Sequence, residues 1–168
     1  MPDRRDLEPV FLAPFVSSAM KVEPAWIDYN GHLNMAYYNV LFDRAVDEAF
    51  ELLGCGADYV KTGFSTFTAE VHVRYLRELH DGDPVRVSFQ LLDYDEKRMH
   101  YFEQLLHAEE GWVSATSENM SLHVDMAAKK TAPFPPEVTR RLARMKASHA
   151  QLPRPEAAGR RVAMPGQS

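Results

Sequence analysis

The densest group of chemically useful side chains lies between residues 26 and 38. A carboxylate, Asp28, is followed by Gly31, His32 and the amide-bearing Asn34. Just after Asn34 a helix is predicted to begin, and the first N–H groups of a helix have no partner within it, so they favour developing negative charge. This pattern suits a site in which helix N–H groups hold a carbonyl oxygen while a carboxylate attacks the carbonyl carbon or activates water. The alternative interpretation of the same residues is an ordinary capped turn.

The element that must position this turn is a helix predicted from Met35 to Leu53. Apolar residues recur there at spacings of three and four, and polar residues fill the other face. Asn34 stands at the N-cap position, and Gly54 stands where a left-handed residue commonly ends a helix. At about nineteen residues the helix is long for a single domain.

The period of apolar residues changes from 3.6 to 2 after this helix, which indicates strands. Strands are predicted at about residues 15–22, 71–75, 85–91, 99–106 and 112–126, and a final helix at about 136–148. The first half of the last strand does not alternate cleanly, which allows a bulge. One strand, a long helix and four strands joined by short turns predict an α+β fold with an antiparallel sheet. Its unpaired edges need protection, and pairing of two sheets edge to edge in a dimer would provide it.

Length and composition limit the classes of protein to which this chain could belong. The chain has 168 residues, of which 45% are apolar and 26% charged, typical of one soluble domain. We expect that domain at residues 10–150, followed by a loose tail rich in Pro and Gly at 151–168. A net charge of −5 argues against a general nucleic-acid binder, and no apolar run approaches the roughly 20 residues of a membrane span. The first residues lack a signal-peptide pattern and Cys55 is the single cysteine, so a cytoplasmic protein is expected.

Other kinds of chemistry have weaker support in the sequence. The seven histidines are scattered, without the spacing of a zinc site, so we expect no metal. No Gly-x-Ser-x-Gly elbow or phosphate-binding loop occurs. Cys55 has no obvious histidine partner and is interpreted as a buried small residue.

The spacing Asp28-x-x-Gly31-His32-x-Asn34-x-x-x-Tyr38 resembles the signature of hotdog-fold acyl-CoA thioesterases of the 4-hydroxybenzoyl-CoA thioesterase type. In that family a five-stranded antiparallel sheet wraps around one long central helix, in agreement with the element order above. The stretch from 71 to 83 is similar to the family's strand after the helix and the turn that ends it. The resemblance covers about residues 15–126.

The resemblance implies hydrolysis of a small acyl-CoA by a homodimer or homotetramer, with no metal or redox cofactor. CoA then arrives as part of the substrate. Asp28 matches the catalytic carboxylate, as either base or nucleophile, and the N–H of Met35 is a candidate donor to the thioester oxygen. The expected catalytic residues are Asp28, His32, Asn34 and Met35, and the expected substrate-binding residues are Trp26, Tyr29, Gly31, Tyr38, Arg74 and Arg77.

A narrower resemblance concerns residues 22–38, which look like the thioesterases of bacterial carnitine degradation that cleave betainyl-CoA to glycine betaine and CoA. A trimethylammonium group has no N–H, so aromatic faces are its usual partners. Candidates for such an aromatic cage are Trp26 and Tyr29 first, and also Tyr37, Tyr38, Phe64 and Phe67, although all of them could instead be core or dimer contacts. Arg74 and Arg77 could contact the phosphates of CoA, or they could be an exposed strand edge. An aromatic or medium-chain acyl substrate, and a non-catalytic acyl-CoA-binding domain, are the alternatives.

Overall fold

One antiparallel sheet dominates the computed structural model, which describes residues 8–166. Its long strands are β3 (Phe64–Tyr75), β4 (Pro84–Tyr94), β5 (Arg98–His107) and β6 (Val113–Asp125). They lie in the order β4-β5-β6-β3. Three two-residue strands complete the sheet: β1 (Phe15–Val16) and β2 (Met20–Lys21) pair with β4, and β7 (Lys130–Thr131) pairs with β6.

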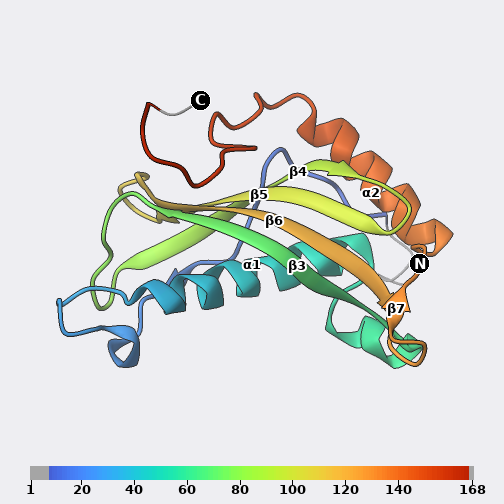
Figure 1. The fold of residues 1–168 in the computed structure, drawn as a ribbon, viewed down its shortest axis with the longest axis horizontal. Coiled ribbons are helices and arrows are strands. Elements are labelled where there is room, and N and C mark those ends of the chain that lie inside the picture. Colours follow the sequence, from blue (N-terminus) through green and yellow to red (C-terminus); the bar gives the residue numbers. More distant parts are fainter. Residues whose placement is uncertain (1–7, 167–168) are drawn as a thin grey trace, which may run out of the picture.

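Helix α1 (Tyr38–Leu53) lies across one face of this sheet, which curves over it (Figure 1). A short 3-10 turn, Met35–Tyr37, precedes it, and the Asn34 Oδ1 caps that turn by accepting from the Ala36 N–H at 3.0 Å. Gly54 ends the helix in the left-handed region with φ 83°. The predicted end of the helix at Leu53 and the α+β hotdog architecture are therefore confirmed, whereas residues 35–37 at its predicted start form the 3-10 turn and the α-helix begins at Tyr38.

The core lies between the helix and the sheet and forms two adjacent clusters. The first half of α1 packs with Leu79 and with residues of β4, β5 and β6. Its second half packs with β4, β5 and a second helix, α2 (Pro136–His149). Burial of one continuous apolar stripe thus fixes both ends of α1 against the sheet. No helix within residues 8–166 combines the length and apolar character needed to cross a bilayer.

The prediction of one continuous strand at residues 15–22 is wrong, because this segment forms two separate strands, β1 and β2. The Ser17 hydroxyl accepts from the Val87 N–H at 3.0 Å, and the Ser18 N–H donates to the Glu48 carboxylate at 2.8 Å. The Ser17 N–H still donates to the Val87 carbonyl at 2.8 Å, but the side-chain bonds of Ser17 and Glu48 take two further N–H groups out of the regular ladder. The expected irregularity in the last strand is confirmed, since β6 bulges at Ser114 relative to β5.

Residues 151–166 contain no helix or strand. They lie against the sheet, where the Gly159 N–H donates to both Glu118 carboxylate oxygens at 2.8 and 3.0 Å. The division into a domain and a tail at residue 150 stays a prediction.

Helix α2 is fastened to the sheet by the ring of His149, its last residue. The Nδ1 accepts from the Leu91 N–H at 2.8 Å, so the Nε2 carries the proton and donates to the Leu12 carbonyl at 2.8 Å. The ring is therefore neutral in the folded protein. Burial lowers the pKa of His149, which is 1% exposed, although the bond to Leu12 opposes this shift.

We predict that the free energy of unfolding falls as the pH drops from about 7 to 5. The folded pKa of His149 is lower than the unfolded value of about 6.5, so protons bind preferentially to the unfolded chain. The stability that the neutral ring provides is therefore complete above that unfolded pKa and is lost as the pH falls toward the folded one. Urea unfolding across this range, compared with His149→Asn, measures the contribution. An identical pH dependence in both proteins would contradict it.

Candidate active site

The turn that carries Asp28 is a tight hairpin held by its own backbone. Ile27 and Leu33 form an isolated antiparallel bridge, the Asp28 N–H donates to the His32 carbonyl at 3.1 Å, and the Gly31 N–H donates to the Asp28 carbonyl at 3.0 Å. Gly31 has a φ of 86°, a conformation that other residues adopt only with strain. The predicted substrate-binding residue Gly31 therefore shapes the backbone of the turn.

The carboxylate of Asp28 is half-buried and oriented by one hydrogen bond. Its Oδ1 accepts from the Asn30 N–H at 2.8 Å. Within residues 8–166 no donor reaches the other oxygen, Oδ2. One oxygen thus fixes the side chain while the other remains available to attack a carbonyl carbon or to accept a proton from water.

The start of the helix lies beside this carboxylate. The Asn34 N–H donates to the Trp26 carbonyl at 2.9 Å, which ties the cap to the beginning of the hairpin. Asn34 also accepts hydrogen bonds from two of the N–H groups that follow it. Its Oδ1 accepts from the Ala36 N–H and its carbonyl accepts from the Tyr37 N–H. The N–H of Met35 has no partner in the part of the chain that the structure describes, and it is the one suited to hold an oxyanion.

A cavity of about 490 Å³ joins the hairpin, the helix start and the end of β3. Predicted site residues that line it are Asp28, Tyr29, His32, Asn34, Met35, Tyr38 and Arg77. Trp26, Gly31 and Arg74 are not part of its lining. The catalytic residues expected from the sequence therefore share one cavity with three of the expected substrate-binding residues.

The aromatic residues proposed as a cage lie in different environments. Trp26 is 7% exposed, stacks on Tyr37 with ring centroids 5.8 Å apart, and has the Arg44 guanidinium 5.2 Å from its centroid. Tyr29 is 98% exposed. Trp26 is thus a core residue whose ring already contacts a cation of the same chain, whereas Tyr29 remains open to a ligand.

The two candidate arginines also differ in their surroundings. Arg77 lies over the Trp112 ring, 3.9 Å from its centroid, at the end of the cavity. Arg74 is half-buried in β3, in register with Thr116 of β6. Only Arg77 therefore lies at the cavity that holds Asp28.

Two cavity residues escaped the sequence analysis. Tyr75 donates through its hydroxyl to the Met35 carbonyl at 2.9 Å and packs edge-on against Tyr38, with centroids 4.9 Å apart. Glu78 contacts the His32 Nε2 at 3.3 Å. Tyr75 fell at the end of a predicted strand, and nothing in that strand's alternation marks contact with a turn forty residues earlier.

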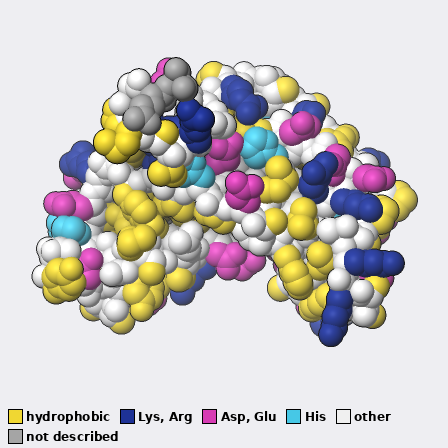
Figure 2. Space-filling view, viewed as in Figure 1, with side chains coloured by type: hydrophobic (Ala, Val, Ile, Leu, Met, Phe, Trp, Pro, Cys, Tyr) yellow, Lys and Arg dark blue, Asp and Glu magenta, His cyan; other side chains and the backbone are white. Residues whose placement is uncertain are grey.

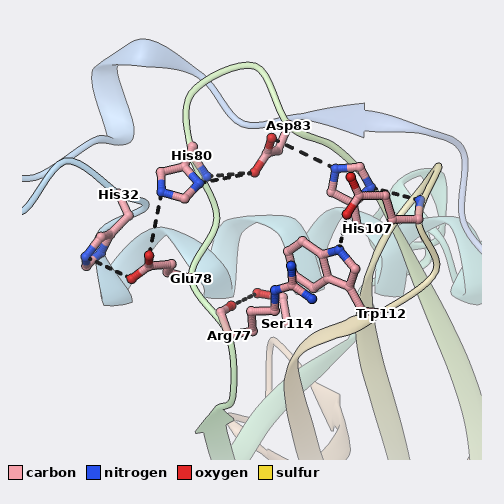
Figure 3. A network of polar contacts seen from close by, with 9 residues as sticks. His32, Arg77, Glu78, His80, Asp83, His107, Trp112 and Ser114 are labelled. Carbon is pink, nitrogen blue, oxygen red and sulfur yellow. Dashed lines mark hydrogen bonds and ion pairs between the residues drawn. The ribbon is translucent and has the colours of Figure 1, made fainter.

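Glu78 opens a chain of polar contacts along the loop after β3 (Figure 3). It lies 3.3 Å from the Nε2 of His32 and 3.7 Å from that of His80. Asp83 lies 3.9 Å from both His80 and His107. The backbone adds a firmer link, since the Leu33 N–H donates to the Leu79 carbonyl at 2.8 Å. The loop therefore contacts the Asp28 hairpin at both His32 and Leu33.

The sequence is similar to known thioesterases. A betainyl-CoA thioesterase of Pseudomonas aeruginosa is 39% identical over 145 residues, which cover 86% of this chain and 91% of that protein. An L-carnitine dehydrogenase/betainyl-CoA thioesterase of Rhizobium meliloti is 42% identical over 142 residues, and there the match covers 84% of this chain but 29% of the relative.

The fold also agrees with solved structures. The Staphylococcus aureus protein SAV2348, determined in complex with CoA, superposes with a TM-score of 0.84 at 28% identity, over 94% of this chain and 99% of that one. A thioesterase candidate from Pseudomonas putida gives 0.77 at 32% identity, over 90% and 97%. The model of the thioesterase-like superfamily matches residues 22–142. With the catalytic hairpin, the helix start and most of the sheet inside that match, this chain belongs to the thioesterase-like superfamily.

Proposed function

We propose that this protein hydrolyses betainyl-CoA to glycine betaine and CoA. The observation that carries the reaction is the placement of the Asp28 carboxylate and the unpaired Met35 N–H on one cavity. The substrate is supported by the Pseudomonas aeruginosa relative, a betainyl-CoA thioesterase that matches over 91% of its length. An acyl-CoA substrate is further supported by the CoA-bound Staphylococcus aureus structure.

The reaction begins with the thioester oxygen accepting a hydrogen bond from the Met35 N–H. Asp28 then attacks the carbonyl carbon or removes a proton from a water that attacks it, and negative charge develops on the oxygen. The carbon–sulfur bond breaks, the hydroxyl of water ends on the acyl carbon, and CoA leaves with the remaining proton on sulfur. The positive end of the helix dipole stabilises the charged intermediate.

The remaining cavity residues position the reacting groups. Asn34 fixes the helix start by accepting from the Ala36 N–H, and the Met35 N–H has no partner among the described residues. Tyr75 holds the carbonyl of Met35 from the other side. Arg77, at the cavity and stacked on Trp112, is suited to meet a phosphate of CoA.

Tyr38 and Tyr75 also favour a second candidate substrate. Their edge-on pair forms an aromatic wall of the cavity, and such a wall would bind an aromatic acyl group as well as a trimethylammonium group. Hydrolysis rates on a panel of acyl-CoA substrates distinguish a preference for an aromatic acyl group from one for a trimethylammonium group.

The free edge of β3 supports a homodimer. Within the described chain, β3 pairs with β6 alone, so its other edge is unpaired along a twelve-residue strand. Phe67 and Val71 on this strand are 55% and 43% exposed. Pairing with the same strand of a second copy would satisfy the edge and cover these apolar side chains.

We predict that Asp28→Asn retains the fold and loses hydrolysis by roughly 10²- to 10⁴-fold, because an amide neither accepts the proton nor attacks the carbonyl. Thiol release from betainyl-CoA measures the loss, and circular dichroism checks the fold. Asp58→Asn is the matched control, since Asp58 is exposed and pairs with Lys61 at 3.0 Å. Activity of Asp28→Asn within about threefold of the parent would remove Asp28 from the reaction.

We predict a dimer that Phe67→Lys weakens, because two lysines would meet across the paired edges. Light scattering during gel filtration gives the mass of each protein. Val16→Lys is the control: Val16 is 44% exposed and lies on β1, at the opposite edge of the sheet. A parent protein that is fully active as a monomer would overturn the proposal.

We predict that betainyl-CoA is preferred over its neutral isostere, the 3,3-dimethylbutyryl thioester, by at least about tenfold in kcat/KM. A desolvated cation contact contributes up to about 2 kcal/mol, and the loss of water from the cation offsets part of that gain. Steady-state kinetics with both thioesters measures the ratio. Equal values would show that the site does not recognise the charge.

A further inference from the structure

Glu103 is a carboxyl group in a place where the strand pattern demands an apolar side chain. It lies on β5 between Tyr101 and Leu105, in phase with these two core residues, and is 1% exposed. Its Oε1 accepts from the Asn119 Nδ2 at 3.3 Å. Its Oε2 has no hydrogen-bond partner within the described residues.

An incompletely paired buried carboxyl is costly to the fold. Burial raises the pKa of Glu103 well above its usual range, and the nearby charge of Asp43 raises it further. No Lys, Arg or His among residues 8–166 forms an ion pair with Glu103. Apart from the Asn119 bond, nothing among the described residues offsets this cost, which points to a role in binding.

Glu103 lines a cavity of about 400 Å³ between α1 and strands β3, β5 and β6. Asp43 of α1 lines it as well, together with the aromatic residues Phe42 and Tyr101. Two carboxyl groups with no basic residue in the lining favour a cation. Since no group of three metal-ligating side chains occurs within residues 8–166, an organic cation fits this lining better than a metal ion.

We propose that Glu103 is the specificity-determining residue that holds the positive charge of the acyl group, in a site completed by the Asp28 hairpin of a second copy. This inference rests on the proposed function. A trimethylammonium group suits the cavity because it spreads its charge over methyl groups, which pack against aromatic rings and need no hydrogen-bond acceptor. A cation bound beside Glu103 would favour its ionised form, and the Oε2, which has no partner within the described residues, would then carry negative charge at short range.

The betainyl group is short, and this is the reason for assigning the Asp28 hairpin of the site to a second copy. In a betainyl group one methylene separates the thioester carbon from the nitrogen, so both must lie within a few ångströms of each other. Asp43 follows Asn34 by nine residues, a separation of roughly 13 Å along the helix. The Asp28 hairpin and Glu103 also line two cavities that share no lining residue, so the proposal assigns the hairpin that acts on a group held by Glu103 to the second copy.

The surface has room for such a partner. Thr68 and Val71 of the unpaired edge strand line the cavity of Glu103, so it opens at the edge proposed for dimerisation. Figure 2 shows the surface hollowed beneath α1, between the lobe of the Asp28 hairpin and the lobe of the 3-10 turn Ala57–Thr62. Antiparallel pairing of two β3 edges runs the two α1 helices in opposite directions, which brings the helix start of one copy toward the middle of the other.

The first test is Glu103→Gln, which keeps the shape and the acceptor for Asn119 but removes the charge. We expect the ratio of kcat/KM for betainyl-CoA to that for the 3,3-dimethylbutyryl thioester to fall by roughly tenfold, which removes most of the preference of the parent. Asp43→Asn, at an exposed position that tolerates change, lowers the same ratio by a smaller factor. Glu118→Gln is the control, because Glu118 pairs with His100 at 2.8 Å and does not line this cavity.

An unchanged ratio in both Glu103→Gln and Asp43→Asn would overturn the inference. The proposed function would still stand if the parent prefers betainyl-CoA, and it would fail separately if the parent has no such preference.

The second test mixes subunits. Co-expressed Asp28→Asn and Glu103→Gln chains form a heterodimer in which one site combines an intact Asp28 from one copy with an intact Glu103 from the other. We expect that heterodimer to regain the betainyl-CoA preference and about half the parent activity, which neither homodimer has. Absence of recovery would show that Asp28 and Glu103 serve the same site from one chain or from none.

Discussion

The position of the first N–H groups of the 3-10 turn Met35–Tyr37, which leads directly into α1, is the constraint on which the rest of the structure depends. These N–H groups can hold an oxyanion only if they stay unpaired and face a carboxylate. In an ordinary helix end, water or the capping side chain accepts their hydrogen bonds. Here the cap of Asn34 satisfies the second and third N–H groups and leaves that of Met35. The sheet buries the remainder of the helix and thereby holds that end still.

The hairpin of Asp28 is attached to the same frame at several points. It is bound to the helix start through Asn34 and Trp26, and to the loop after β3 through Leu33 and Leu79. Trp26 serves this attachment from the core, which explains why an aromatic residue beside the catalytic carboxylate is buried. Its packing fixes the distance between the carboxylate and the helix, and this distance decides whether a carbonyl fits between them.

Elements governed by one strong local pattern could be predicted from the sequence. The helix was predicted to within a few residues because its apolar stripe, its Asn cap and its Gly terminator agree. The first half of β3 was missed, since the run from Phe64 to Glu70 is largely polar and lies at an exposed edge, where burial imposes no alternation. The break between β1 and β2 was missed because it depends on a Ser17 bond to a strand seventy residues away.

The residues of the candidate site also fall into those that a local sequence pattern predicts and those that only the fold brings together. That the residues of the Asp28 hairpin lie together could be predicted because they are adjacent in the sequence, whereas Tyr75 and Glu78 reach the cavity only through the fold. Glu103 carried a signal that went unused: a carboxylate in phase with Tyr101 and Leu105 on an otherwise apolar strand face. Such a residue departs from the pattern that folds the chain, and departures of this kind tend to mark function.

The most direct test is to observe the thioester carbonyl in the site. Asp28→Asn, which should bind betainyl-CoA without cleaving it, can be loaded with substrate labelled with ¹³C at the thioester carbon and studied by infrared difference spectroscopy. A hydrogen bond from the Met35 N–H, together with the helix dipole, should shift the carbonyl stretch to a lower frequency than in water. A bound carbonyl that absorbs at its aqueous frequency would contradict the proposed role of the helix start.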